Sequence, residues 1–393
     1  MFRQPAIVPA AALVEGCPPD LPAWCFYRRE QTTPRARLLA VGDVGFSAAL
    51  ARTGADHDPF AEVAPLLSRG DVVFANLETP LLSESAGGQP FAGHTPAAGV
   101  LSRAGFSLVH LANNHIYDFG PGGLASTLAA CRAAGLVPLG AGDTPQAARG
   151  LVRTDANGLR IGWLGCGRTL VRQHETGPRF WEFHPDELME AVRQARPHVD
   201  VLILSIHIGL MYLDYPDPDH KALAERLQAA GADLILMHHA HVLQGVQASP
   251  QGVICHNLGN FLLDWREGNV PPDVAIEQQT QGAVFLFELG GGGVCLAAAL
   301  PTYLDTHFRV RWARGPRGQA ILERLARISR DLAGDYRPLF ARQRAARNTG
   351  LTLKVLAFHL RRGNWPFVWA QLRRTRPKHL GMLARWLIHG TDS

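Results

Sequence analysis

Short apolar runs alternate with helical stretches along most of the chain. Six runs rich in Val, Ile and Leu have the pattern of strands buried on both faces; they cover residues 37–42, 71–76, 107–112, 159–165, 200–206 and 233–238. Stretches of helical character lie between several of them, at residues 121–135, 185–197 and 220–231. This alternation predicts a layered α/β fold rather than separate all-α and all-β units.

The pattern changes in the last third of the chain. Residues 252–265 and 282–300 have no helix between them and read as strands joined by tight glycine turns, so we expect a mixed sheet. After about residue 310, apolar residues recur at the spacing of one helix face. We therefore divide the chain into an irregular, proline-containing N-terminal extension (residues 1–35), an α/β domain (36–310) and a basic helical C-terminal region (311–393).

Composition agrees with a folded protein in a reducing compartment. Of the 393 residues, 47% are hydrophobic and 19% charged. No apolar stretch approaches the roughly 18 residues of a membrane span, and the short N-terminal apolar patch is interrupted by prolines, so we expect no signal peptide or membrane anchor. None of the six cysteines form a CxxC pair, which argues against a zinc–cysteine site and a disulfide framework.

The net charge of +5 is a property of the C-terminal tail. Eleven Lys and Arg residues but one acid follow residue 340, interleaved with aromatic residues such as Trp365 and Trp386. Three interpretations remain open: helices that dock on the main domain, a basic segment that lies flat on an anionic membrane, or a contact with a partner protein or acidic polymer. The main domain has no excess of basic residues, so we expect no nucleic-acid partner.

Polar segments follow five of the strand-like runs. Each supplies Asp, Glu, Asn or His, which are donors that divalent metals prefer, from loops at strand ends. The segments are VGDVG (41–45), ANLETPL (75–81), LANNHIYDFG (111–120), SIHIG (205–209) and HHAHVLQ (238–244).

Two divalent cations that clamp a phosphate ester require carboxylates, neutral imidazoles and often an amide oxygen, with a further histidine as general acid. His115 is the candidate acid. His239 and His241 are one residue apart, so on an extended segment they would point the same way and His238 the opposite way. The candidate metal ligands are Asp43, Glu78, Asn114, His207, His239 and His241.

Several neighbouring residues have open roles. Asp118 fits orientation of a loop or histidine better than metal binding. His238 either supports a ligand or faces the substrate, and His94 is a candidate substrate contact. A last group forms either the floor of a substrate pocket or a purely structural turn: Asn257, Gly259, Asn260 and Asp264.

The strings ANLETPL, LANNHIYDFG, GAGDTPQAA, AGADLILMHHAHVLQG and HNLGNFLLD, in this order, resemble the bacterial capsule-synthesis CapA family, named for poly-γ-glutamate capsules and related to calcineurin-like metallophosphoesterases. The resemblance covers residues 37 to about 300. It implies a metallophosphoesterase-like α/β/β/α sandwich with a C-terminal helical extension. It also implies two divalent metal ions, for which this donor set suits manganese, iron or zinc.

Carried over residue by residue, the resemblance makes Asp43 and His241 ligands of a first metal. Asn114, His207 and His239 would bind a second metal, and His115 would act as acid toward the leaving group. Glu78 would bridge the two metals, with Asn76 as a weaker contender.

The chain departs from the family pattern without losing a proposed ligand. Gly45 stands where classical phosphoesterases have a histidine. Ile208 and Met211 replace a Trp and a Glu that the family commonly has, Met237 replaces a Gly, and Ala240 a Pro. These changes alter the surroundings of the ligands, so the family's substrate does not transfer automatically.

The resemblance favours a divalent-metal-dependent hydrolase in capsule, exopolysaccharide or poly-γ-glutamate biosynthesis, acting on a phosphoester or on a bond in an anionic envelope polymer. The alternative is a scaffold or polymer-handling component with a structural or vestigial metal site. We expect a cytoplasmic protein, or one peripheral at the inner face of the cytoplasmic membrane through its basic tail.

Overall fold

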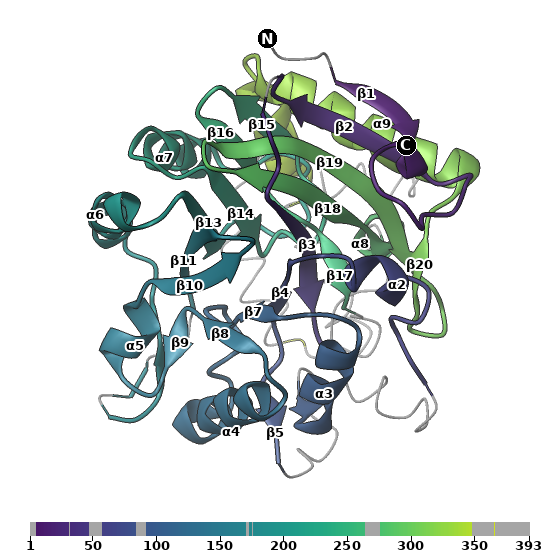
Figure 1. Ribbon diagram of the computed structural model, residues 1–393. Helices are drawn as coiled ribbons and strands as arrows, with labels where there is room; N and C mark the ends of the chain where they lie inside the picture. The colour runs from purple at the N-terminus through teal and green to yellow at the C-terminus, as the bar shows by residue number, and fades with distance from the viewer. Residues whose placement is uncertain are drawn as a thin grey trace.

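The structure is a computed structural model that describes residues 5–30, 32–46, 57–83, 92–169, 173–174, 176–263, 276–347 and Trp365. Two sheets pack face to face, with helices on their outer faces (Figure 1). The predicted α/β/β/α sandwich is confirmed. The predictions for Asp264 and for the tail beyond residue 347, except Trp365, lie outside the described residues.

The larger sheet has ten strands within the described residues, in the order β1-β2-β19-β18-β3-β4-β7-β8, with β17 beside β3 and β20 beside β19. The strands β3, β4, β7 and β8 are parallel, whereas β18 is antiparallel to both β3 and β19, so the predicted mixed sheet is confirmed. Their bounds are β1 (Ala6–Pro9), β2 (Pro22–Arg28), β3 (Ala36–Val44), β4 (Val72–Leu77), β7 (Leu108–His110), β8 (Val137–Leu139), β17 (Asn260–Leu262), β18 (Gln281–Gly290), β19 (Gly293–Leu304) and β20 (Val310–Trp312).

The smaller sheet has six described strands in the order β10-β11-β13-β14-β16-β15, and its central strands β11, β13, β14 and β16 are parallel. Their bounds are β10 (Val152–Ala156), β11 (Leu159–Gly167), β13 (Val201–His207), β14 (Leu234–His238), β15 (Val246–Ser249) and β16 (Gly252–Cys255). Two further pairs are β5 (Leu81–Leu82) with β6 (Gly93–His94), and β9 (Ala141–Gly142) with β12 (Arg179–Phe180).

Alternate side chains of each central strand enter different layers. In β3, Leu38 belongs to the core between the two sheets and Leu39 to the core under the outer helices, as expected for a strand buried on both faces. Phe74 of β4 stacks on Trp163 of β11, with ring centroids 5.5 Å apart, and so joins the two sheets.

Helices cover both outer faces of the sandwich (Figure 1). The larger sheet carries α2 (Ala64–Leu67), α3 (Pro96–Arg103) and α4 (Gly120–Ala133), and the smaller sheet carries α6 (Pro185–Ala195) and α7 (Pro218–Ala229). The remaining helices are η1 (Ala10–Ala12), α5 (Pro145–Arg149), η2 (Arg196–His198), α8 (Ile276–Thr280) and α9 (Gly315–Leu332).

The expectation that residues 1–35 are irregular is wrong, because they contain the strands β1 and β2. The strands β1 and β2 continue the larger sheet, and β2 pairs with β19. Trp24 and Phe26 of β2 are buried in the core between the sheets. Burying two aromatic side chains stabilises this pairing, although the local sequence shows no clear strand periodicity.

The expected helical character after residue 310 is confirmed for α9 and for residues 337–347. The helix α9 packs on β2, β15 and β19. Trp365 is 55% exposed. Within the described residues, no helix combines the length and apolar character that crossing a membrane requires.

Candidate metal centre

Parallel strands bring the candidate ligands together, because their carboxyl ends meet at one edge of the sandwich. Asp43 lies near the end of β3 and Glu78 directly follows β4. His207 is the last residue of β13, and His239 directly follows β14. Asn114 lies in the loop after β7.

A first donor group consists of Asp43, Glu78 and His241, whose ligand atoms all lie within 4.8 Å of one another. All three side chains are completely buried. His241 Nδ1 is 3.2 Å from Asp43 Oδ2, and His241 Nε2 is 3.6 Å from Glu78 Oε1.

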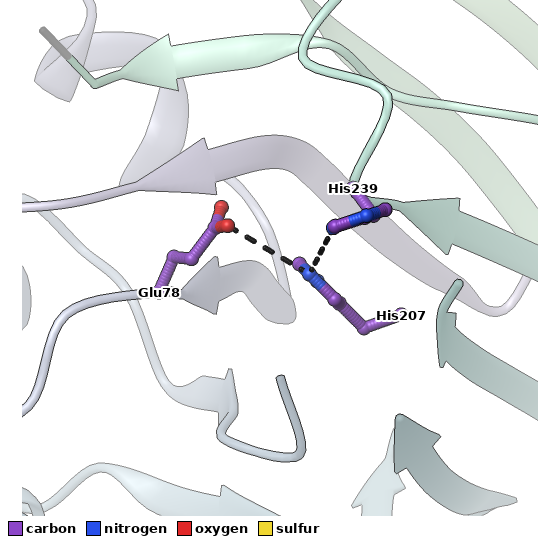
Figure 2. A group of neighbouring side chains, drawn as sticks. All are labelled: Glu78, His207 and His239. Carbon is purple, nitrogen blue, oxygen red and sulfur yellow. Dashed lines mark hydrogen bonds and ion pairs between the residues drawn. The ribbon is translucent and has the colours of Figure 1, made fainter. Parts of the chain in front are cut away.

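A second donor group consists of Glu78, His207 and His239 (Figure 2). His207 Nε2 lies 3.1 Å from His239 Nδ1, 3.7 Å from Glu78 Oε1 and 2.7 Å from Asn114 Oδ1. Glu78 belongs to both groups, so its carboxylate would be available to a cation held in either of them.

The buried oxygens of Glu78 provide the test of whether a metal fits. Neither oxygen has a hydrogen-bond partner among the described residues, although both are inaccessible to solvent. A buried carboxylate without partners is costly, and divalent cations are one way to satisfy it. The surrounding imidazoles, carboxylates and amide oxygen suit manganese, iron or zinc, so these residues fit two divalent cations.

The histidines of the second group are held neutral. Burial, with a contribution from His239, lowers the pKa of His207 well below its ordinary value. Burial, with a contribution from His241, lowers the pKa of His239 to about 3. Only neutral imidazole binds a metal, so both side chains are in the ligand form at neutral pH.

In the first donor group, by contrast, the acidic side chains favour the protonated, positively charged form of His241. Burial alone would lower the pKa of His241, but Glu78 and Asp43 outweigh it and raise the pKa to about 9. Burial and the nearby Asp43 raise the pKa of Glu78 well above its ordinary value. The two adjacent acidic groups favour a proton on the buried imidazole, and a cation would take the place of that proton.

Left-handed backbone positions the histidines after β14. His239 has φ 95°, and His241 has φ 58°. The prediction of an extended segment here is wrong, because β14 ends at His238 and the chain bends sharply after it. Tyr212 in the facing loop has φ 64°, and its N–H donates to Ala240 O over 2.8 Å. Such strained conformations cluster at functional sites.

His238 lies next to the candidate ligand Asp43. Its ring is completely buried, with centroids 5.9 Å from that of His110 and 6.4 Å from that of His207. His238 Nδ1 lies 3.3 Å from Asp43 Oδ1. This position, next to Asp43, fits support of a ligand, and the substrate-contact role considered for His238 stays a prediction.

Asn260 contacts a candidate ligand, and Asn257 contacts the turn beside it. His241 Nδ1 donates to Asn260 Oδ1 over 3.0 Å, which directs His241 Nε2 toward Glu78. Asn257 Oδ1 accepts the N–H of Gly259 over 2.9 Å and shapes a turn. Both asparagines are at most 3% exposed, and these contacts agree with the structural alternative, while the substrate-pocket role stays a prediction.

The same turn passes close to β3. A Cβ placed on Gly42 would lie 1.9 Å from Gly259 O, and Gly259 itself has φ 69°. The N–H of Asp43 donates to Gly259 O over 2.9 Å. Glycine at both positions therefore lets the two backbones meet and fixes where Asp43 emerges.

His115 lies on the more exposed side of the centre. Its Nδ1 donates to Asp118 Oδ2 over 2.8 Å, and the two side chains are 18% and 31% exposed. Asp118 thus contacts a histidine and belongs to neither donor group. His94 lies in β6 paired with Leu82, and within the described part of the chain it forms no hydrogen bond to a candidate ligand. Its assignment as a substrate contact stays a prediction.

Asn76 and Asn113 form buried hydrogen bonds around the ligands, a role that was not expected from the sequence. Asn76 Nδ2 donates to Asp43 Oδ1 over 2.8 Å and lies 3.2 Å from His207 Nδ1, so Asn76 orients ligands of both groups instead of bridging metals. Asn113 Nδ2 donates to Leu77 O over 2.8 Å, and Asn113 Oδ1 accepts from the Ile116 N–H. The unusual polar run after an apolar strand was the available signal.

Comparison with known proteins identifies relatives over this domain. Residues 37–265, more than half of the chain, match the model of the family described as bacterial capsule synthesis protein PGA_cap. The capsule biosynthesis protein CapA of Bacillus anthracis is 33% identical over 227 residues, which cover 54% of this chain and 55% of that protein. The PGA biosynthesis protein CapA of Bacillus subtilis is 29% identical over 215 residues, 52% of this chain and 56% of that protein.

The chain therefore spans about half the length of the curated relatives it matches. Among solved structures, a phosphatase from Mycoplasma pneumoniae aligns with a TM-score of 0.47 and 15% identity, over 78% of this chain and 100% of that chain.

Proposed function

Because the chain belongs to the bacterial capsule synthesis protein PGA_cap family, we propose that it serves capsule or poly-γ-glutamate biosynthesis as a divalent-metal-dependent hydrolase. The bond would be a phosphoester or a bond in an anionic envelope polymer. The observation that supports this most is Glu78, a buried carboxylate without hydrogen bonds that belongs to two donor groups at once.

The chain's own residues would divide the work between binding and proton transfer. Asp43 and His241 would hold one cation, with Glu78 shared; Asn114, His207 and His239 would hold the other. Two bound cations stabilise negative charge on the attacking and leaving oxygens of a phosphoester.

His115 would donate the proton to the leaving oxygen. Asp118 orients its ring through Nδ1.

The first test combines metal content with activity. Elemental mass spectrometry of the metal-loaded protein should find two equivalents, reduced in an Asp43→Ala, His241→Ala double variant. A screen of phosphoesters and γ-glutamyl amides should then find activity that His115→Ala lowers by about 10²- to 10⁴-fold. Because His115 belongs to neither donor group, that variant should keep its metal.

A non-catalytic scaffold for polymer assembly is the second candidate. A direct contact of 3.1 Å between His207 Nε2 and His239 Nδ1 joins two members of the second donor group to each other, as a structural role would allow. Absence of bound metal after reconstitution with manganese, iron and zinc would refute the hydrolase and leave the scaffold. Capsule production retained by a strain carrying the Asp43→Ala, His241→Ala variant would favour the scaffold as well.

We also propose a location in the cytoplasm or at the inner face of the cytoplasmic membrane, from the basic, aromatic composition of residues 341–393. Co-sedimentation with vesicles that contain phosphatidylglycerol, and loss of binding at high salt, would support membrane contact. Equal binding to neutral vesicles would contradict the electrostatic basis.

A further inference from the structure

An arginine from outside the family-matched segment lies beside the candidate metal centre. Arg347 Cζ is 5.9 Å from the centroid of the Tyr212 ring, and that ring is 6.0 Å from the ring of His241. Arg347 and a histidine of the first donor group therefore both lie against the Tyr212 ring.

Arg347 has no counter-charge within the described residues. Its Nε is buried without a hydrogen-bond partner, and no described carboxylate forms an ion pair with it. Other arginines of this region are paired, such as Arg324 with Asp214 and Arg327 with Asp331. A half-buried guanidinium without a partner is costly, and an anionic ligand would satisfy it.

The position of Arg347 is set by the packing of the C-terminal helices on the loop after β13. Gln343 Nε2 donates to Asp214 Oδ2 over 3.1 Å, and the Asp214 N–H donates to Gln343 Oε1 over 3.0 Å. Arg347 lies four residues after Gln343 in the helical segment 337–347, so the two lie on the same helix face.

Further contacts fix the same loop from α9. Tyr215 Oη donates to Asp331 Oδ2 over 2.6 Å, and the Tyr215 and Tyr336 rings have centroids 5.9 Å apart. The loop and the C-terminal helices also share a cluster of buried hydrophobic residues, which consists of Leu213, Tyr215, Ile328, Leu332, Tyr336 and Phe340. The C-terminal helices and the loop that carries Tyr212 thus form one packed unit beside the centre.

We propose that Arg347, seated on the face of Tyr212, binds a phosphate group of the substrate beside the metal centre. The proposal deepens the hydrolase function and rests on the two cations proposed there. A guanidinium forms two parallel hydrogen bonds with a phosphate, and the aromatic face holds it by a cation–π contact.

The net charge of the metal-loaded site favours a phosphate over a carboxylate as the group that Arg347 binds. Asp43 and Glu78 offset about half of the charge of two divalent cations, and the neutral histidines offset none, so Arg347 adds to an existing positive excess. A phosphate dianion matches this excess better than a single carboxylate of a glutamate polymer.

The test measures inorganic phosphate binding to the full-length, metal-loaded protein by equilibrium dialysis. Arg347→Gln should weaken phosphate binding by about 10- to 100-fold, the usual loss for a charged hydrogen-bonded pair. Arg347→Lys should recover part of it, since lysine keeps the charge without the fork. Arg344→Gln is the matched control: it removes an equal charge from an exposed position one turn earlier and should leave the affinity unchanged.

Metal content and melting temperature of each variant separate a binding defect from misfolding. Equal phosphate affinity in Arg347→Gln and the wild type, or equal weakening by Arg344→Gln, would overturn the proposal while a dinuclear hydrolase stands. A wild type that takes up no metal would refute the hydrolase; Arg347-dependent phosphate binding in that case would still support the anion site. Binding of a γ-glutamyl dipeptide in place of phosphate would overturn the phosphate assignment.

Discussion

The clearest prediction concerns Asn260→Ala, because Asn260 touches only one of the two donor groups. Its Oδ1 accepts from His241 Nδ1 and its Nδ2 donates to Gln279 O, both over 3.0 Å, and it is 3% exposed. Removing it deletes one of the contacts that direct the His241 ring toward Glu78. The second group, with His207, has no contact with Asn260 and should be unaffected.

The expected size follows from the loss of one buried partner of a metal-binding histidine. Such losses usually weaken metal affinity by about 10- to 100-fold, or about 1.4 to 2.7 kcal/mol. Competition titration with a chelator should therefore resolve one weakened and one unchanged site. Loss of the two buried hydrogen bonds should also cost the metal-free protein about 1 to 3 kcal/mol of unfolding free energy.

A double-mutant cycle with His241→Ala separates the causes. If Asn260 acts through His241, Asn260→Ala should change metal affinity by less than about 0.5 kcal/mol in the His241→Ala background. Unchanged affinity at both sites in the single variant, together with weaker binding of a phosphoester, would refute this reasoning and make Asn260 a substrate contact.

Three further predictions concern packing, orientation and pH. Gly42→Ala should lower the unfolding free energy by about 1 to 3 kcal/mol or more in urea titration, because its Cβ meets the backbone oxygen of Gly259 at 1.9 Å. Asp118→Asn should lower hydrolysis by about 10- to 100-fold while metal content stays constant, because His115 loses its orienting carboxylate; unchanged hydrolysis would contradict this role. Burial lowers the pKa of His256 to about 3 in the folded protein, whereas its pKa in the unfolded chain is about 6.5. The stability of the metal-free protein is therefore fully present above about pH 6.5, and it decreases as the pH falls below about 6.5, because the unfolded chain then binds a proton that the folded protein does not. Between pH 7 and 5.5 the loss should be about 1 kcal/mol, and His256→Gln should abolish this share of the slope.

The local pattern of apolar and polar residues was sufficient to predict the strands and the types of metal-donor residue. Leu38 and Leu39 enter different cores because successive residues of a strand point to opposite faces, a property independent of distant parts of the chain. Asp43 lies near the end of β3 and Glu78 directly follows the parallel strand β4, so their meeting at one edge was predictable from the order of the strands.

Local pattern failed where distant segments decide conformation. The strand β2 forms because Trp24 and Phe26 find a core and β19 offers an open edge, and neither is visible in residues 1–35. Likewise His239 and His241 adopt left-handed backbone, which their own sequence disfavours and only the surrounding packing sustains.

The sequence by itself determined the layered α/β character, the order of the polar segments and the donor types, because these depend on periodicity and chain direction, while the sandwich followed from the family resemblance. Only the tertiary structure decided that Glu78 belongs to both donor groups, that Asn260 acts on His241, and that Arg347 reaches Tyr212. The physical reason is that side-chain contacts between remote segments depend on the packing of the whole molecule, whereas periodicity reflects only neighbours along the chain.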